Sequence, residues 1–351
     1  MTGLQQLLTR IWAMRGLPNQ HPWLHLTDGL LLAPIGRTCH RTLGCLPSAT
    51  LARLLQEEQG PIHWIRPGGM GDWVILAPFL DGVRRWRNHP EDTLWVTPGA
   101  FSLAKTYHQG TGLRIRLATA GALIAASKPS LLLQLEPFHP AAWIWAGLLH
   151  ADRVAGYPPS DPCSFSWPPV RPMIDDMAAF HPGIDPFYPE PVPKESRSRI
   201  LVFASGAHPA RQLPPAFAQR LADGPTREVS WFGPLPLKTL PKGWEWVQER
   251  MLAPDLLSRI RYAKGLVGPD SGPYHLGRLL GTPTVGYFTS GELGRWGWPT
   301  PHSRVVVTSF HCRGCTVGSY PAPCPHGFGC VEDKDVLYLI EALDSVMGIQ
   351  L

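Results

Sequence analysis

Two short glycine-containing turns hold the residues that are best suited to chemistry. The more informative one, residues 268–277, reads Gly-Pro-Asp-Ser-Gly-Pro-Tyr-His-Leu-Gly and lies between the apolar run 265–267 and a Gly-Thr-Pro break at 281–283. This order predicts a strand, a tight turn, a short helix and a second strand. A helix that begins in such a turn exposes backbone N–H groups with no intrahelical partner, and these groups attract anions, phosphate above all. The segment therefore predicts a phosphate-binding site.

The second turn, Arg-Pro-Gly-Gly-Met-Gly-Asp at residues 66–72, follows a predicted strand at 63–66 and opens a predicted helix. It contains three glycines, which allow a ligand to come close to the backbone. They are Gly68, Gly69 and Gly71. Asp72 stands where the helix begins, so it is either a capping carboxylate or a general base that the helix N-terminus keeps ionised. The residues alone leave both roles open.

A third cluster consists of four of the seven cysteines, which fall within a short stretch before the last predicted helix. They are Cys312, Cys315, Cys324 and Cys330. Their spacing fits a tetrahedral thiolate site for a structural zinc or iron, with free thiols or disulfides as the alternatives. A closed shell of four thiolates leaves no coordination position for a substrate. Cys39, Cys45 and Cys163 lie outside the cluster and are expected to be plain thiols.

The elements around these residues alternate between strand and helix, which predicts parallel sheets covered by helices on both faces. We expect two Rossmann-like, doubly wound domains facing each other across a ligand cleft, with the acceptor domain at 60–185 and the donor domain at 196–351. The prolines between 172 and 199 indicate a linker, and the cysteine-rich loop spans 311–330. Residues 1–59 are predicted to form a helical extension.

Composition narrows the classes of partner. An apolar fraction of 44% among 351 residues supports a sizeable core. The net charge of +5 comes without a long Lys/Arg run, which favours anionic small substrates and argues against nucleic acid. Neither a signal peptide nor an apolar run of spanning length is evident, so we expect a cytoplasmic protein. Met1–Gly16 is an amphipathic helix expected to dock on the protein body, with peripheral contact at the inner membrane as the alternative. The sequence does not indicate an oligomeric state.

Together the two turns resemble glycosyltransferase family 9, the heptosyltransferase-type enzymes of the GT-B fold. The 66–72 turn resembles the family's N-terminal motif, and Asp-Ser-Gly-Pro-x-His-Leu at 270–276 resembles its donor-binding motif. Arg-Val-Ala-Gly-Tyr at 153–157 is similar to the end of its first domain. Residues 204–214 resemble its Lys/Arg-x-Trp-Pro stretch, with Leu213 in place of the tryptophan. The resemblance covers about residues 60 to 345.

The resemblance implies an inverting transfer of a sugar, typically from ADP-heptose, that needs no metal or other cofactor for catalysis. Asp72 would act as the base on an acceptor hydroxyl, and Arg211 would contact the leaving diphosphate. The donor-binding residues that it implies are Ser205, Gly206, Arg211, Asp270, Ser271, Gly272, Pro273 and His275. Asp270 has a helix cap as its alternative role, and His275 is favoured as a structural residue over a catalytic acid.

The resemblance also implies acceptors of two kinds: a lipid-linked glycan such as lipopolysaccharide core, or a protein. Relatives that modify autotransporter proteins hold an iron through four thiolates like those at 312–330, which is why a protein acceptor is considered. Trp296 and Trp298 are candidates for contacting the nucleotide or closing the cleft. Basic residues that suit a phosphorylated acceptor, or simply a solvated face, are Arg84, Arg85, Arg114 and Arg116.

One departure from the family leaves the nucleotide open. Family members carry a glutamate that holds the ribose shortly after the glycine equivalent to Gly233, whereas this chain continues Pro-Leu-Pro-Leu-Lys. A catalytically inactive sugar-nucleotide-binding or assembly protein on the same fold is therefore the alternative function. A dinucleotide-dependent oxidoreductase is disfavoured because the chain lacks Gly-x-Gly-x-x-Gly followed by an acidic residue about 20 positions later.

Overall fold

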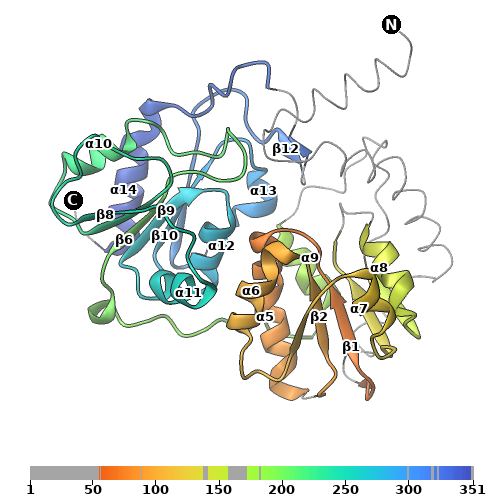
Figure 1. Ribbon diagram of the computed structural model, residues 1–351. Helices are drawn as coiled ribbons and strands as arrows, with labels where there is room; N and C mark the ends of the chain where they lie inside the picture. The colour runs from red at the N-terminus through yellow and green to blue at the C-terminus, as the bar shows by residue number, and fades with distance from the viewer. Residues whose placement is uncertain are drawn as a thin grey trace, which may run out of the picture. The chain divides into compact units, whose positions relative to one another are not determined.

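The chain forms two compact units that divide between Phe187 and Tyr188 (Figure 1). The computed structural model describes most of both units. The described residues are 55, 57–87, 89–136, 141–156, 172–181, 183–298, 300–317, 320–321 and 324–348. Nearly all of the predicted helical extension at 1–59 lies outside this range, as do Cys39, Cys45 and Cys163. No helix among the described residues is long and apolar enough to cross a membrane.

The first unit is a five-stranded parallel sheet with the strand order β3-β2-β1-β4-β5. Its strands are β1 (Ile62–Ile65), β2 (Thr93–Val96), β3 (Arg114–Leu117), β4 (Leu131–Gln134) and β5 (Arg153–Gly156). Its helices are α5 (Met70–Trp86), α6 (Pro98–Tyr107), α7 (Ala120–Ile124), α8 (Ala141–Leu149) and α9 (Met173–Phe180). Strands β1, β2 and β4 are buried along their whole length, which explains why most of their residues are apolar.

The second unit is a six-stranded parallel sheet with the order β11-β10-β9-β6-β7-β8. Its strands are β6 (Ile200–Phe203), β7 (Val229–Phe232), β8 (Trp244–Val247), β9 (Gly265–Pro269), β10 (Thr284–Phe288) and β11 (Ser303–Val307). Its helices are α10 (Phe217–Ala222), α11 (Ala253–Arg261), α12 (Gly272–Leu279), α13 (Leu293–Trp296) and α14 (Val336–Met347), with the 3-10 turns η2 (Lys194–Ser196) and η3 (Asp333–Asp335). A short antiparallel pair, β12 (Thr316–Val317) and β13 (Tyr320–Pro321), lies in the cysteine-rich loop.

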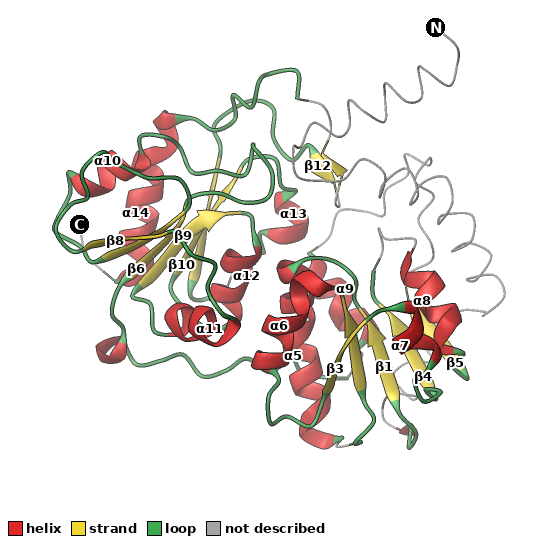
Figure 2. Ribbon diagram, viewed as in Figure 1, coloured by secondary structure: helices red, strands yellow, loops and turns green. Residues whose placement is uncertain are grey.

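Strands and helices alternate through both units except between β7 and β8 (Figure 2), so the predicted pair of doubly wound α/β domains is confirmed. In each sheet the first strand lies between the second and the fourth strand of its unit. These are β1 between β2 and β4, and β6 between β7 and β9. The chain therefore reverses its winding direction at these two strands. In open parallel sheets, ligands bind outside the carboxyl ends of the strands at such a reversal. Both glycine turns of interest occur at this kind of edge.

Helix α9 occupies part of the segment that the prolines suggested was a linker. Met173 and Met177, one turn apart, are completely buried, and the helix packs against α5. The apolar i, i+4 spacing of these residues forms a helix despite the surrounding prolines. The prediction of an irregular linker over 172–199 was therefore wrong for residues 173–180. The domain limits at 185 and 196 remain predictions.

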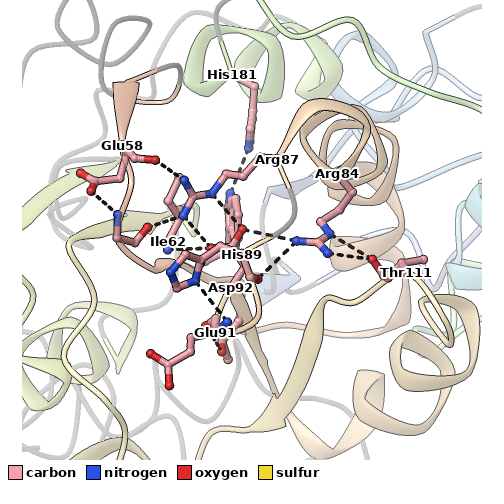
Figure 3. A network of polar contacts seen from close by, with 12 residues as sticks. Glu58, Ile62, Arg84, Arg87, His89, Glu91, Asp92, Thr111 and His181 are labelled. Atoms are coloured by element: carbon pink, nitrogen blue, oxygen red, sulfur yellow. Dashed lines mark hydrogen bonds and ion pairs between the residues drawn. The ribbon is translucent and has the colours of Figure 1, made fainter.

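The end of α5 is fastened to the amino ends of β1 and β2 through a buried aspartate (Figure 3). Asp92 is completely buried and accepts hydrogen bonds from Arg87 Nε at 2.9 Å, Arg87 Nη2 at 3.0 Å and the Ile62 backbone N–H at 2.9 Å. Arg87 also donates to the carbonyl oxygens of Glu58 and Gly60. This network holds the edge of the sheet that lies opposite the strand carboxyl ends.

Arg84 belongs to the same network. Its Nε and Nη2 donate to the Thr111 carbonyl at 3.0 and 2.9 Å, and its Nη1 lies 3.6 Å from Asp92 Oδ2. Arg85 stacks its guanidinium 3.6 Å from the centre of the Phe187 ring. Both arginines are in the last turn of α5, whereas Asp72 is in the first. We therefore withdraw Arg84 as a candidate for binding a phosphorylated acceptor, because its side chain is committed to the fold.

His181, just beyond α9, holds that helix to the sheet (Figure 3). Its Nδ1 donates to the Met177 carbonyl at 2.7 Å, and its Nε2 accepts a hydrogen bond from Trp64 Nε1 at 3.2 Å. These two bonds define one neutral tautomer. Burial lowers the pKa of His181 to about 4, and the bond to Met177 offsets only part of that effect.

The lowered pKa of His181 predicts acid sensitivity. The unfolded chain binds a proton at this histidine below about pH 6.5, whereas the folded protein excludes that proton until about pH 4. Stability should therefore fall as the pH drops from 6.5 to 4, with no further loss from this group below pH 4. In His181→Gln, whose amide can make both hydrogen bonds without titrating, the melting temperature should depend less steeply on pH over that window. Equal slopes for the two proteins would contradict this assignment.

Candidate functional site

The turn between β1 and α5 places Asp72 with one carboxylate oxygen engaged in capping. Asp72 Oδ2 accepts the backbone N–H of Gly69, the residue that precedes the helix, at 2.7 Å. Asp72 Oδ1 lies 3.3 Å from Arg66 Nη2, and the Asp72 side chain retains 31% of its exposure. The capping role is therefore present, and it leaves the carboxylate accessible. Its role as a base remains a prediction.

Among the three glycines of this turn, Gly68 has a backbone that strongly favours glycine. Its φ is +139°, and a Cβ atom at that position would lie 2.5 Å from Asp72 Oδ2. Gly69 has an ordinary φ of −83°, and its nearest neighbour to such a Cβ would be 3.8 Å away. Gly71 lies in the first turn of α5. Thr97, the residue after β2, holds this turn in place, because its hydroxyl donates a hydrogen bond to the Gly68 carbonyl.

Sequence reasoning missed the side chain that contacts Asp72 and the second carboxylate that this side chain binds. Arg66 was seen only as part of the motif, and Glu136 was not considered. Arg66 is almost fully buried and also lies 3.2 Å from Glu136 Oε2, which follows β4. The proximity of these residues results from the pairing of β1 with β4, strands that are far apart in the sequence. The motif alone contained no signal of that pairing.

In the second unit, Asp270 is the buried centre of the donor-type turn. It lies 3.5 Å from Arg211 Nη2 and 3.1 Å from His275 Nε2. Burial by itself would raise the pKa of Asp270, but the charge of Arg211, followed by the bond and charge of His275, brings that pKa below its ordinary value. Gly291 leaves room for this carboxylate, since a Cβ at Gly291 would lie 2.1 Å from Asp270 Oδ2. Helix α12 begins after Ser271, so Asp270 binds two basic side chains from a position just before the cap.

The residues predicted to bind the donor diphosphate come together in this unit. A bridge between Ser205 and Gln212 closes a loop, and Gly206 N donates to the Arg211 carbonyl at 2.6 Å. A Cβ on Gly206 would lie 3.6 Å from Ser271 Cβ, so this loop lies against the start of α12. Gly272 and Pro273 form the first turn of α12.

Several buried polar atoms at this turn have no hydrogen-bond partner among the described residues. They include Arg211 Nε, Ser271 Oγ and Ser290 Oγ, together with Asp270 Oδ2 and Tyr274 Oη. Buried donors and hydroxyls are normally satisfied, so unpaired ones at a helix start point to a ligand. Together with the N–H groups of α12, they fit a diphosphate well.

Helix α12 also fastens the tryptophan-containing loop that follows α13. Arg278 is buried, lies 4.1 Å from the Trp298 ring centre and donates to the carbonyl oxygens of Trp296 and Trp298. His275 stacks on Trp298 with ring centres 6.2 Å apart. These contacts favour a structural role for His275 and a fixed position for the loop. A role of the two tryptophans in nucleotide binding remains a prediction.

The turn after β7 contains no acidic side chain near its glycine. Gly233 has a φ of +134°, and its carbonyl accepts the indole N–H of Trp246 at 2.9 Å. The indole of Trp231 binds the Pro234 carbonyl at the same distance. The turn that departs from the family pattern is therefore held by two indole hydrogen bonds to its carbonyls. No residue is assigned to the ribose.

The four clustered cysteines line one pocket, which they share with His208 and His326. None of the four forms a disulfide in the described part of the chain. Burial, followed by the neighbouring thiols, raises the pKa of Cys330 to about 11. The carbonyl of Cys330 is fixed by the hydroxyls of Thr308 and Tyr287 at 2.7 and 3.2 Å.

The expected metal site is not confirmed. In the described part of the chain, no three His, Cys, Asp or Glu side chains are grouped so that they could hold a metal ion. The sulfur donors suit zinc or iron chemically, and they surround one pocket. Their arrangement is not that of a formed metal centre.

The neighbouring glycines of the first turn give a matched test of how Asp72 is positioned. Gly68→Ala should lower the free energy of unfolding by about 1–3 kcal/mol, because the new methyl group meets the Asp72 carboxylate in a backbone conformation that disfavours alanine. Gly69→Ala adds the same group at an ordinary van der Waals distance from Asp72, in a common backbone conformation, and should cost less than about 1 kcal/mol. Urea unfolding measures both. Equal losses for the two variants would be inconsistent with the geometry of the turn.

Residues 249–320 match the model of glycosyltransferase family 9 (heptosyltransferase), and this stretch contains Asp270, Ser271 and α12. No curated protein matches the chain.

Solved structures match over most of the chain. The glycosyltransferase family 9 protein from Veillonella parvula DSM 2008 is 16% identical, with a TM-score of 0.57 over 83% of this chain and 98% of its own. The E. coli ADP-heptose lipopolysaccharide heptosyltransferase II is 14% identical, with a TM-score of 0.57 over 82% and 98%. The iron-containing dodecameric glycosyltransferase TibC from enterotoxigenic E. coli is 13% identical, with a TM-score of 0.51 over 83% and 80%.

At these identities the structural likeness establishes the fold, which is that of the GT-B glycosyltransferases. The family match falls on the donor-type turn and supports glycosyl transfer as the general activity. The resemblance stated from the two sequence motifs is thereby confirmed: residues 249–320 are similar to glycosyltransferase family 9, and the chain has the GT-B fold.

Proposed function

We propose that the protein is an inverting glycosyltransferase that moves a sugar, with heptose the leading candidate, from a nucleotide-diphosphate donor to a hydroxyl group. The observation that carries the proposal is the cluster of Arg211, Asp270 and Ser271 at the start of α12. Asp270 and Ser271 lie within the stretch that matches the family, and Arg211 contacts it through Asp270. Such a cluster suits a diphosphate, because it combines a cation with N–H groups at a helix start.

In the proposed reaction, Arg211 and the first turn of α12 bind the donor diphosphate. Asp270 keeps Arg211 in place from the buried side, at 3.5 Å. When the sugar–phosphate bond breaks, the diphosphate gains negative charge. A fixed positive charge and N–H groups beside the diphosphate would stabilise this charge in the transition state, because they need no reorganisation during the step.

Asp72 is proposed to accept the proton of the acceptor hydroxyl. The hydroxyl oxygen then attacks the anomeric carbon from the face opposite the diphosphate, and the carbon–oxygen bond to phosphate breaks as the new glycosidic bond forms. A single displacement inverts the anomeric configuration. The Asp72 side chain suits this role, because it is 31% exposed and its Oδ1 lies 3.3 Å from Arg66.

The finer identities of the substrates are part of the proposal. ADP-heptose is the favoured donor because the similar E. coli protein is an ADP-heptose heptosyltransferase. The favoured acceptor is a glycan such as lipopolysaccharide core, with a protein as the other acceptor class. The turn at Gly233, which lacks the family's acid, favours one second candidate: a sugar-nucleotide-binding protein without transferase activity.

A pair of variants separates donor binding from transfer. Asp72→Asn should keep the rise in melting temperature that ADP-heptose causes in the wild type, while transfer falls by about 10²- to 10⁴-fold, because only the base is lost. Arg211→Gln should lose the rise in melting temperature as well. Thermal shift and ADP release with core oligosaccharide as acceptor measure the two effects. Unchanged transfer by Asp72→Asn would remove Asp72 as the base, and donor binding without any transfer by the wild type would favour the inactive alternative.

We also propose that the four clustered thiols bind a structural zinc or iron. The support is their common pocket and their donor chemistry, together with the iron reported for TibC. The ion would bind Cys312, Cys315, Cys324 and Cys330 and would stiffen the loop, with no part in the reaction.

Elemental analysis tests the metal directly. The purified wild type should carry about one zinc or iron per chain, and a chelator should lower its melting temperature. Cys312→Ser should lose the metal, whereas Cys163→Ser, outside the cluster, should keep it. A folded wild type that contains no metal, and whose melting temperature a chelator leaves unchanged, would refute this proposal.

A further inference from the structure

A buried arginine behind Asp72 is shared between two carboxylates. Arg66 retains only 1% of its side-chain exposure, and its Nη atoms lie 3.3 Å from Asp72 Oδ1 and 3.2 Å from Glu136 Oε2. Its Nε also donates to the Asp72 carbonyl at 3.2 Å, and its Nη1 donates to the Leu135 carbonyl. The guanidinium thus connects the first turn of α5 to the chain just after β4.

Glu136 is itself held in a defined position. The side-chain amide of Gln134 accepts the Glu136 N–H at 2.8 Å and donates to the Glu136 carbonyl at 2.9 Å. Gln134 is completely buried at the end of β4. The adjacent strand makes room for it with Gly156, where a Cβ would lie 2.1 Å from the Gln134 carbonyl oxygen. This gives a physical reason for the glycine in the Arg-Val-Ala-Gly stretch.

The shared arrangement matters when Asp72 changes charge. If Asp72 is the base, as proposed above, it becomes neutral each time it accepts a proton. A buried guanidinium with that carboxylate as its single counter-charge would then be uncompensated, which is costly in a buried site. Glu136, also buried, supplies a second negative charge that does not take part in the proton transfer.

We propose that Glu136 is a positioning residue for sugar transfer, which holds Arg66, and through it Asp72, in place while Asp72 is protonated. This inference rests on the proposed function of Asp72. It assigns to Glu136 no contact with either substrate. Gln134 and Gly156 are needed because they fix the backbone from which Glu136 reaches Arg66.

The kinetic test compares variants that differ in charge at this position. Glu136→Gln keeps the shape and removes the charge, and its kcat should fall by about 10- to 100-fold with the KM values for donor and acceptor unchanged. Glu136→Asp, which keeps the charge on a shorter side chain, should lie between this variant and the wild type. The control is Asp81→Asn. Asp81 lies on α5, as Asp72 does, and its carboxylate binds Tyr107 and His108 at 2.8 and 3.3 Å. A purely structural role would lower activity in proportion to stability in both variants, and a wild-type kcat for Glu136→Gln would overturn the proposal.

A second readout does not require activity. Hydrogen exchange should be faster in the peptide covering residues 66–73 of Glu136→Gln than in the wild type or Asp81→Asn, because Arg66 is less firmly held. Unchanged exchange there would overturn the positioning role. Absence of transfer by the wild type would instead count against the proposed function. If Glu136→Gln does not fold, the double variant Arg66→Met, Glu136→Met removes the charge pair together, and a wild-type kcat in it would contradict the proposal.

Discussion

Each unit presents one charged group to solvent and backs it with a buried partner of opposite charge, and the two units do so with opposite signs. In the first unit the arginine is buried, with 1% exposure for Arg66, and the carboxylate is accessible, with 31% for Asp72. In the second unit the carboxylate is buried, with 4% for Asp270, and the arginine is accessible, with 22% for Arg211. One unit therefore offers a carboxylate and the other a cation. These are the charges needed by a base and by a diphosphate site.

This pairing is a consequence of the parallel sheet. All strands of a unit end at the same edge, so residues that follow different strands can meet there. Arg66 follows β1 and Glu136 follows β4, while Asp270 follows β9 and Arg211 lies on the loop after β6. Three glycines leave the space that these groups need. A methyl group at Gly68 would overlap the carboxylate of Asp72, and one at Gly291 would overlap that of Asp270. A methyl group at Gly156 would overlap the carbonyl oxygen of Gln134, which supports Glu136.

The sequence was sufficient for the parts of the site that lie within single motifs. Each turn could be predicted because its glycines, its acid and the following helix are contiguous. The contacts of Glu136 could not be predicted, because they depend on β1 pairing with β4. Trp64 lies opposite Leu133, 69 positions further along the chain, and no local pattern encodes that pairing. Arg84 was a candidate for a phosphorylated acceptor or for a solvated face. Its contact with Asp92 could not be predicted, because Asp92 lies beyond the end of the helix. The helix at 173–180 was missed because proline signals outweighed two buried methionines.

The central claim is that the second unit recognises a nucleotide through its diphosphate, at Arg211 and the start of α12. Isothermal titration of the wild-type protein with ADP and with adenosine tests it directly. We predict that ADP binds and that adenosine binds far more weakly, since the groups proposed to hold the donor are a cation and the N–H groups of a helix start, which suit phosphate oxygens. Equal affinity for ADP and adenosine would contradict the account, because recognition would then rest on the base and ribose.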